Sequence, residues 1–204
     1  MDSNTFSNSG NLTLFIGPMF SGKTTKLLRV HNDVRFMKKI NSNNNLKKDY
    51  LINFIKDNRY GRSTLIITHD GIKEECLAVE NLSQLWNNEE FNENYKSNNI
   101  ENLFINEGQF FQDIFEFSLF ILENSSINIF IAALDSDYLR NKFGNIWNLI
   151  PHAHTVDKLK GQCKFCNNNS IYTLKTTHDS QQTVIASDIY EPVCRNCYLK
   201  KNLS

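Results

Sequence analysis

A glycine-containing segment near the start of the chain constrains its fold most strongly. Residues 17–24 read GPMFSGKT, which matches the pattern G-x-x-x-x-G-K-[ST] at every fixed position. The apolar run before it, Leu12–Ile16, predicts a buried strand. The segment after it carries apolar residues at the spacing of one helix face: Leu27, Val30, Val34 and Met37. A strand, a glycine loop and a helix in this order predict a phosphate-binding loop (P-loop).

Each part of this loop has a chemical reason to be there. Glycines let backbone N–H groups turn toward phosphate oxygens, and the following helix N-terminus adds partial positive charge. Lys23 can reach the terminal phosphates, and the Thr24 hydroxyl can ligate Mg²⁺. The predicted ATP- and Mg²⁺-binding residues of the loop are Gly17, Pro18, Met19, Phe20, Ser21, Gly22, Lys23 and Thr24. The loop does not identify the group that receives the phosphate.

Length, charge and hydropathy narrow the class of protein. A chain of 204 residues can form one sizeable domain and a small appendage. Its formal net charge is zero, which argues against a primary nucleic-acid binder. No apolar run approaches the ~20 residues of a membrane span, and residues 1–10 lack the apolar core of a signal peptide. We therefore expect a cytoplasmic protein with a flexible tail at 1–10.

Short apolar runs alternate with helical patterns through the middle of the chain. The expected strands are Tyr50–Ile55, Thr64–Ile67, Leu103–Ile105 and Ile127–Ala133, and the expected crossover helix is Phe111–Glu123. This alternation predicts an α/β fold, with a P-loop NTPase-like parallel sheet flanked by helices. Asn-rich stretches at 41–45, 87–99 and 167–169 predict loops. The composition turns polar after Pro151, so we place a domain boundary near Asp157, between a P-loop α/β domain at 11–157 and a small cysteine-bearing domain at 158–204.

Four of the five cysteines predict a metal site. Cys163 and Cys166 form one C-x-x-C pair, Cys194 and Cys197 form another, and 27 residues separate the pairs. Four thiolates suit a tetrahedral, structural Zn²⁺ with bonds of about 2.3 Å, which leaves no open position for chemistry. A redox dithiol and a nucleic-acid-binding zinc ribbon remain alternatives for this segment. The metal would tie together two expected strands, Ile171–Leu174 and Thr183–Ile185. The fifth cysteine, Cys76, is expected to be a small buried apolar residue.

Asn106 and Glu107 follow the expected strand Leu103–Ile105. Ligands of open α/β sheets bind at the carboxyl ends of strands, and an acidic residue there commonly serves Mg²⁺ or the attacking group. Glu107 could accept a proton from an attacking hydroxyl or orient that hydroxyl. The alternative is that Glu107 only begins the helix that follows.

Seen in order, these segments resemble the thymidine kinases of the cellular and poxvirus type (type II), which couple a P-loop domain to a zinc-held lasso. The matching stretches are GPMFSGKTT at 17–25, DNRY at 57–60, THD at 68–70, EGQFF at 107–111, AALD at 132–135, KFG at 142–144, NLIP at 148–151 and both cysteine pairs. They cover nearly the whole chain in the order of the family.

The resemblance implies ATP-dependent phosphorylation of the 5′-hydroxyl of thymidine or deoxyuridine. It implies that Glu107 is the catalytic carboxylate, assisted by Lys23 and Arg59. It adds Asp57, Asn106 and Gln109 to the ATP and Mg²⁺ site. The implied nucleoside-binding residues are Met19, Phe110, Leu134, Tyr138, Phe143, Thr173, Gln181, Thr183, Ile185 and Tyr190. A homotetramer or homodimer, with neither nucleic acid nor membrane as a partner, is also implied.

Four positions depart from the family pattern. Asn106 stands where the family has an Asp beside Mg²⁺, Ile185-Ala186 replaces a Gly-Gly pair, and Tyr138 replaces a Phe. Losing one negative charge at 106 predicts reduced but real turnover. Two other functions stay open: a nucleotide-binding protein with impaired turnover, and a P-loop ATPase coupled to nucleic acid through its zinc module.

Overall fold

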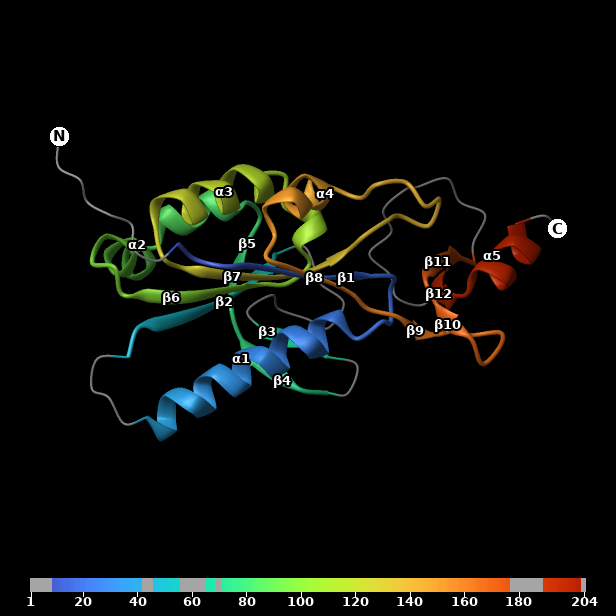
Figure 1. The fold of residues 1–204 in the computed structure, drawn as a ribbon, viewed down its shortest axis with the longest axis horizontal. Helices are drawn as coiled ribbons and strands as arrows, with labels where there is room; N and C mark the ends of the chain where they lie inside the picture. The colour runs from blue at the N-terminus through green and yellow to red at the C-terminus, as the bar shows by residue number, and fades with distance from the viewer. Residues whose placement is uncertain (1–8, 42–45, 56–64, 69–70, 177–188, 203–204) are drawn as a thin grey trace.

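The computed structural model describes residues 9–41, 46–55, 65–68, 71–176 and 189–202. Its centre is a six-stranded sheet in the order β5-β2-β6-β7-β1-β8, with every neighbouring pair parallel (Figure 1). The strands span Leu77–Val79 (β5), Lys48–Phe54 (β2), Ile100–Ile105 (β6), Asn128–Leu134 (β7), Leu12–Gly17 (β1) and Thr155–Lys158 (β8). The predicted parallel α/β architecture is confirmed.

Helices cover both faces of this sheet, as Figure 1 shows. On one face lie α2 (Glu89–Lys96), α3 (Ile114–Asn124) and α4 (Ile146–Leu149), and on the other lies α1 (Lys23–Ile40). The sheet has one hydrophobic core on each face. Leu14 and Ile16 of β1 point into the core under α3, whereas Phe15 points into the core under α1. Because both faces are buried at the centre of the sheet, β1 and β7 are apolar for most of their length, whereas the edge strand β8 is polar and largely exposed. Short 3₁₀ turns at Leu82–Asn87, Gly108–Phe110 and Ile150–His152 complete this part of the chain.

The expected apolar stripe of α1 is only partly correct. Leu27, Leu28 and His31 are the buried residues of the helix, while Met37 is 55% exposed. In the last turns Lys38 faces the sheet instead, with its Nζ 2.6 Å from Asp49 Oδ1 and 2.7 Å from Glu101 Oε2. An ion-pair contact therefore replaces the apolar contact that the helical spacing predicted.

Burial of His31 makes the stability of the fold sensitive to acid. The His31 ring is 6% exposed and packs edge-on against Phe104, with ring centroids 5.0 Å apart. Burial, reinforced by the nearby Arg35 charge, lowers the pKa of His31 below its usual 6.5. The unfolded chain takes up this proton near pH 6.5 and the folded chain does so only at lower pH. His31 therefore costs nothing above about pH 6.5 and destabilises the fold as pH falls below it.

We expect His31→Gln to lose less stability than the parent between pH 7.5 and pH 5.5. The difference should be at most about 1.4 kcal/mol for each pH unit. Urea unfolding at the two pH values measures it. His152→Gln is the matched control, because His152 is exposed. Equal losses of unfolding free energy in the parent and both variants would contradict a role for His31.

The predicted loop at 87–99 is wrong, because this stretch contains α2. The Asn88 side chain caps the helix by accepting a hydrogen bond from the Phe91 N–H at 2.9 Å. Phe91 is fully buried and packs edge-on against Tyr50 and Trp86. One apolar anchor and one cap thus hold a helix in a sequence whose composition is typical of a loop.

The other helices and strands lie closer to the bounds that the sequence predicted. Helix α3 begins at Ile114, three residues after its expected start, because Asp113 accepts hydrogen bonds from the Leu82 and Ser83 N–H groups. The strand expected at Thr64–Ile67 is β3 (Leu65–Ile67). It pairs antiparallel with β4 (Lys73–Glu75) and lies outside the main sheet. Asn167 and Asn168 lie in a loop, as predicted, but Asn169 belongs to a short strand, so the loop predicted at 167–169 is one residue too long. Residues 42–45 lie outside the described residues.

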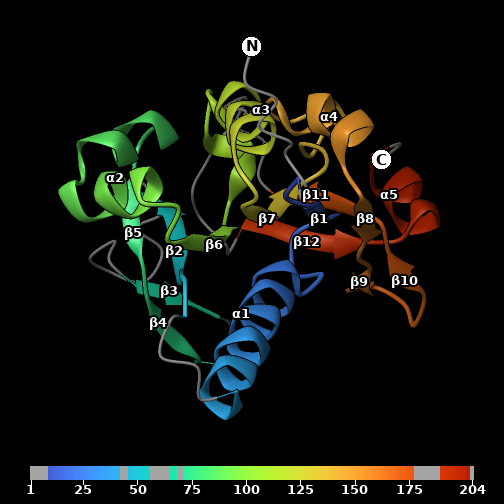
Figure 2. The same ribbon diagram turned by 60° about the vertical axis from the view of Figure 1, so that its left-hand side comes forward.

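The C-terminal segment forms a small module beside the sheet (Figure 2). It holds β9 (Gly161–Gln162) paired with β10 (Asn169–Ser170), β11 (Tyr172–Lys175) paired with β12 (Tyr190–Val193), and α5 (Arg195–Asn202). The partner of β11 is β12. The expected partner Thr183–Ile185 lies outside the described residues. The boundary predicted near Asp157 falls inside β8, so a strand of the main sheet leads into the module; the domain limits themselves stay a prediction.

Among the described residues, no helix has the length and apolar character needed to cross a membrane.

Candidate active site

The predicted site residues gather at the carboxyl edge of the central sheet. The P-loop follows β1, and Asn106 and Glu107 follow β6. Gly17 is in register with Leu134 at the end of β7. Parallel strands bring these segments to one edge, where ligands of open α/β sheets bind.

The P-loop has the backbone conformation that its glycines allow. Gly22 adopts φ 79°, a left-handed conformation that suits glycine, and α1 begins at the next residue. Pro18 O accepts hydrogen bonds from Ser21 Oγ at 2.9 Å and from Lys23 Nζ at 2.6 Å. The Lys23 ammonium therefore lies over the loop, at the positive end of α1.

Asn106 joins the P-loop to the strand end. Its Oδ1 accepts a hydrogen bond from Thr24 Oγ1 at 3.0 Å, and its Nδ2 donates to Asn53 Oδ1 at 3.0 Å. Thr24 Oγ1 and Asn106 Oδ1 are two adjacent oxygen atoms of the kind that Mg²⁺ prefers. Thr24 and Asn106, both predicted for the ATP and Mg²⁺ site, are therefore in direct contact in the structure.

Glu107 occupies a conformation that is rare for its residue type. Its φ of 55° and ψ of 39° are left-handed, which usually costs a non-glycine residue about 1–3 kcal/mol and is found most often at functional sites. Gln109 Nε2 donates a hydrogen bond to Glu107 Oε2 at 2.6 Å, and Gln109 Oε1 accepts one from the Leu134 N–H at 2.8 Å. Buried Gln109 therefore ties the Glu107 carboxylate to the end of β7.

Six of the seven described residues predicted to bind the nucleoside contact one another in pairs, and the seventh, Leu134, donates its N–H to Gln109. The Phe110 and Phe143 rings pack edge-on with centroids 5.6 Å apart. The Tyr138 and Tyr190 rings lie 6.4 Å apart. The Met19 N–H donates to Thr173 Oγ1 at 3.0 Å, which links the P-loop to β11. Residues Asp57, Arg59, Gln181, Thr183 and Ile185 lie outside the described residues, so their predicted roles stay predictions.

The P-loop and the C-terminal module also approach each other at Gly161. A Cβ atom at this position would lie 2.7 Å from Phe20 O, closer than real side chains pack. Glycine is therefore required for the module to sit against the loop.

The four predicted cysteines come together at one point of the module. Their Sγ atoms all lie within 4.8 Å of one another. Cys166 Sγ is 3.6 Å from Cys194 Sγ and 3.7 Å from Cys197 Sγ. A tetrahedral metal with bonds of about 2.3 Å places its sulfur ligands roughly 3.8 Å apart. The thiols therefore form a cluster that could hold a metal ion with four sulfur ligands.

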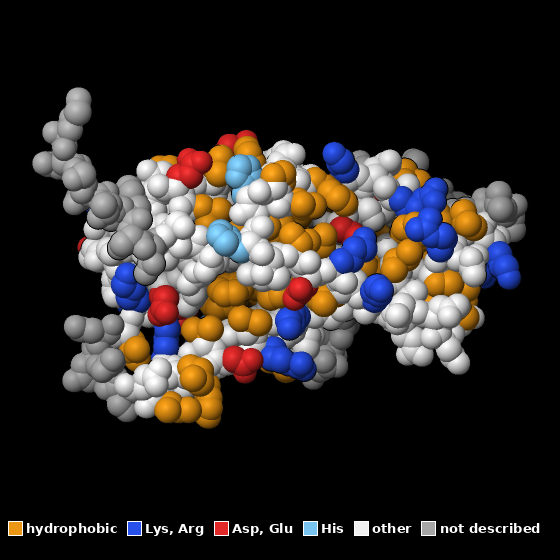
Figure 3. All heavy atoms as spheres, viewed as in Figure 1, with side chains coloured by type: hydrophobic (Ala, Val, Ile, Leu, Met, Phe, Trp, Pro, Cys, Tyr) orange, Lys and Arg blue, Asp and Glu red, His pale blue; other side chains and the backbone are white. Residues whose placement is uncertain are grey.

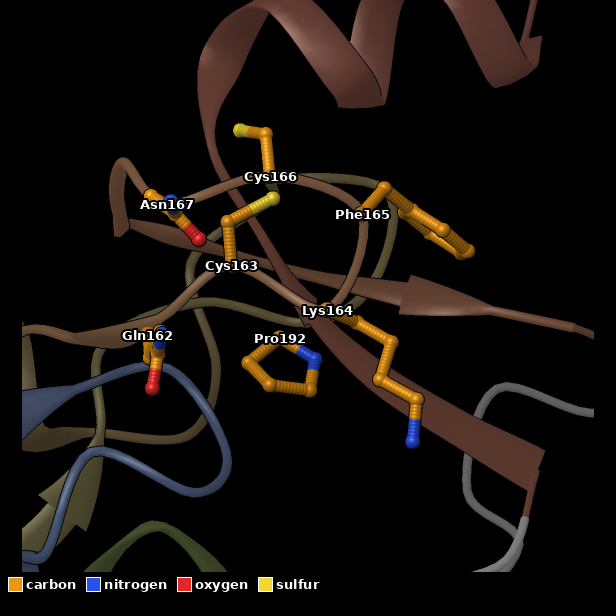
Figure 4. A pocket seen from close by; sticks show the side chains of 7 residues that line it. All are labelled: Gln162, Cys163, Lys164, Phe165, Cys166, Asn167 and Pro192. Atoms are coloured by element: carbon orange, nitrogen blue, oxygen red, sulfur yellow. The ribbon is translucent and has the colours of Figure 1, made fainter.

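A hollow of about 470 Å³ opens beside this cluster, and Figure 4 shows the side chains around it. Cys163 and Cys166 extend to one side of their turn, whereas Lys164 and Phe165 point away from them. The lining residues are Gln162, Cys163, Lys164, Phe165, Cys166, Asn167 and Pro192. The lining includes none of the residues predicted to bind the nucleoside, so this hollow is not the predicted pocket.

Basic side chains gather toward the module on the face shown in Figure 3. Three basic residues of the module contact other residues of the module. Lys201 Nζ lies 4.4 Å from the centroid of the Phe165 ring, Arg195 lies over Tyr172, and Lys164 Nζ is 3.6 Å from Glu191 Oε1. These contacts hold the three basic side chains against neighbouring residues of the module.

Sequence reasoning missed three residues near the site. Asn53 supports Asn106, and the Phe54 ring stacks on Phe110 with centroids 5.2 Å apart. Asp135, which is 2% exposed, pairs with Lys158 of β8 and accepts the Trp147 Nε1–H at its backbone oxygen, 2.6 Å away. A single polar residue inside the apolar run Tyr50–Ile55 was the available signal for Asn53.

Comparison with known proteins identifies the family. The sequence model described as "Thymidine kinase" matches residues 10–198. The thymidine kinase of Oryza sativa subsp. japonica is 36% identical over 191 residues, which cover 93% of this chain and 66% of the rice protein. The thymidine kinase of Yaba monkey tumor virus is 35% identical over 96% of this chain and 98% of its own. The cytosolic thymidine kinase of Bos taurus is 36% identical over 94% of this chain and 73% of its own. The chain therefore belongs to the thymidine kinase family.

Proposed function

We propose that this protein transfers the γ-phosphoryl group of ATP to the 5′-hydroxyl of thymidine, and that deoxyuridine is a second acceptor. The observation that carries the proposal is the contact between Thr24 and Asn106. It joins a P-loop to the strand end that bears Glu107, in a chain of the thymidine kinase family. The loop proposed to bind the phosphate donor and the carboxylate proposed to activate the acceptor hydroxyl thus lie at one edge of the sheet.

The P-loop residues Gly17 to Thr24 would hold the triphosphate through backbone N–H groups, with Lys23 neutralising its terminal phosphates. Thr24 and Asn106 would hold Mg²⁺ through oxygen atoms that already face each other, and Asp57 would complete the site. Mg²⁺, when bound, neutralises charge on the phosphates as the γ-phosphoryl group leaves.

Glu107 accepts the proton of the 5′-hydroxyl or orients that hydroxyl for attack on the γ-phosphorus. Gln109 orients the Glu107 carboxylate through their 2.6 Å hydrogen bond. Arg59 supplies positive charge at the reaction centre. The transfer then depends on positioning and charge neutralisation more than on covalent chemistry by the protein.

The nucleoside would lie against apolar and aromatic residues, with the backbone of Gln181 to Ile185 pairing with the edge of its base. Met19, Phe110, Leu134, Tyr138, Phe143, Thr173 and Tyr190 are the proposed walls. The link between Met19 and Thr173 supports this assignment, because it brings the P-loop against the strand that leads to that segment.

We propose Zn²⁺ as the metal of the cysteine cluster, with a structural role, because four thiolates leave no open ligand position. A cytoplasmic homotetramer or homodimer, without nucleic acid or membrane as a partner, is the proposed working form. The Bos taurus relative, which is named as cytosolic, supports the compartment.

A kinase assay with thymidine, deoxyuridine and deoxycytidine tests the function, with bound zinc measured on the same sample. We expect 5′-monophosphate from thymidine and deoxyuridine, and about one zinc per chain. ATP hydrolysis that needs single-stranded DNA, without nucleoside phosphorylation, would contradict the proposal and favour a nucleic-acid-coupled ATPase.

Asn106→Asp is expected to raise kcat for thymidine. The carboxylate restores a negative charge beside Mg²⁺, and we expect about a tenfold gain, the low end of effects around metal sites. Steady-state kinetics at several Mg²⁺ concentrations measure it. Asn11→Asp is the control, because exposed Asn11 precedes β1, at the end of the sheet away from the P-loop. No gain over this control would mean that Asn106 does not limit turnover.

A further inference from the structure

A buried pair of amide side chains lies behind the P-loop. Asn53 of β2 and Asn106 after β6 are 2% and 3% exposed. The two strands are neighbours, and the Asn106 N–H donates to Ile52 O at 2.9 Å, which continues their register by one residue. The register sets Asn53 beside Asn106, and their side chains meet at 3.0 Å.

The amide of Asn106 has two chemically different ends, and each faces a different partner. Its Nδ2 end donates to Asn53 Oδ1, and its Oδ1 end accepts from Thr24 Oγ1 at 3.0 Å. A half-turn of the amide would put the NH₂ group toward Thr24 and would set two acceptor oxygens, those of Asn106 and Asn53, against each other. The Asn53 oxygen therefore selects which end of Asn106 faces the P-loop.

We propose that Asn53 is a positioning residue that keeps the Asn106 oxygen directed at Thr24 and at the Mg²⁺ of bound ATP. The inference rests on the proposed function and deepens it. An amide is useful to a cation only through its oxygen, whereas its NH₂ end repels one. The neutral side chain at 106 thus needs an orienting partner that a carboxylate would not need, because both carboxylate oxygens are acceptors.

A purely structural role for Asn53 makes a different prediction. If Asn53 only fills space and satisfies a buried polar group, its replacement should have the same effect whichever residue stands at 106. If Asn53 orients an amide, its replacement should matter while 106 is Asn and should lose its effect in the Asn106→Asp background. A double-mutant cycle separates these cases.

The experiment measures ATP binding by titration calorimetry while Mg²⁺ is varied, with EDTA samples as the metal-free reference. Asn53→Leu removes the acceptor at similar size, and Asn53→Asp keeps an acceptor. In the parent we expect Asn53→Leu to raise the half-saturating Mg²⁺ concentration about tenfold, as for other partners of metal ligands. In the Asn106→Asp background the same replacement should change it little. Asn53→Asp should leave it at or below the parental value.

Thermal unfolding of every variant shows that the comparison is between folded proteins, and Asn53→Ala provides the same cycle where the leucine variant does not fold. An equal rise in both backgrounds, or no rise in the parent, would overturn the positioning role while leaving the proposed function intact. A parent protein that binds ATP without dependence on Mg²⁺ would likewise overturn this inference, whereas only a failure to phosphorylate thymidine would overturn the proposed function.

Discussion

Replacing Glu107 by glutamine is expected to lower kcat for thymidine phosphorylation by about 10²–10⁴-fold, the usual contribution of a positioned general base. Glutamine keeps the size of the side chain and an oxygen that can accept the Gln109 hydrogen bond, but it cannot take a proton. ATP binding should change little, because the proposed contacts of the P-loop with the phosphates do not involve this carboxylate. Single-turnover phosphate transfer and ATP titration measure the two effects separately.

Glu123→Gln is the control for this prediction. Glu123 is an exposed carboxylate on α3, so its loss changes the net charge equally without touching the site. Near-normal turnover of the Glu107 variant would show that Glu107 only occupies the turn before α3. A parallel loss of ATP binding would show instead that the substitution disturbs the P-loop.

Loss of one cysteine of the metal cluster is expected to unfold the C-terminal module and to abolish thymidine turnover. Zinc binding supplies about 10–16 kcal/mol of folding free energy to comparably small peptide modules. The module itself buries a small core around Cys163, Leu174, Val193, Cys194 and Tyr198. Cys194→Ser should therefore release the metal and make residues 158–204 susceptible to protease. Metal analysis, limited proteolysis and the kinase assay report the three effects.

Cys76→Ser is the matched control for the metal site. Cys76 packs beside the core under α1, and burial raises the pKa of its thiol to about 12, so it remains an uncharged thiol. We expect this variant to keep its metal and its protease resistance. Full zinc content and full activity in Cys194→Ser would contradict a structural role for the cluster.

The architecture of the domain was predictable because its signals are local. The P-loop pattern, the apolar strand before it and the helix after it are contiguous in sequence, and parallel strands buried on both faces are recognisable as unbroken apolar runs. The helix α2 was not predictable from composition, because one capping Asn88 and one buried Phe91 decide it. The last turn of α1 was misjudged because an ion pair, and not apolar contact, faces the sheet there.

The candidate site likewise has features that the sequence predicted and features that it could not. The cysteine spacing identified the metal cluster, since two C-x-x-C turns carry most of its geometry in the sequence. Asn53 could not be assigned, because its role depends on the register of β2 against β6, which joins residues 53 positions apart. The left-handed backbone of Glu107 is likewise invisible in the sequence, where a glutamate gives no sign of positive φ.

The contacts between the P-loop and the C-terminal module limit where this chain can be truncated. The Met19 N–H bonds to Thr173 of the module, Gly161 lies against Phe20, and β8 belongs to the main sheet although the module follows it directly. A truncated chain ending at residue 157 would cut β8 short, leave the Met19 amide without its partner and remove part of the wall beside the loop. The smallest fragment that preserves the nucleotide-binding loop therefore includes the module, and the two regions are one unit for engineering, recombination and transplantation into other scaffolds.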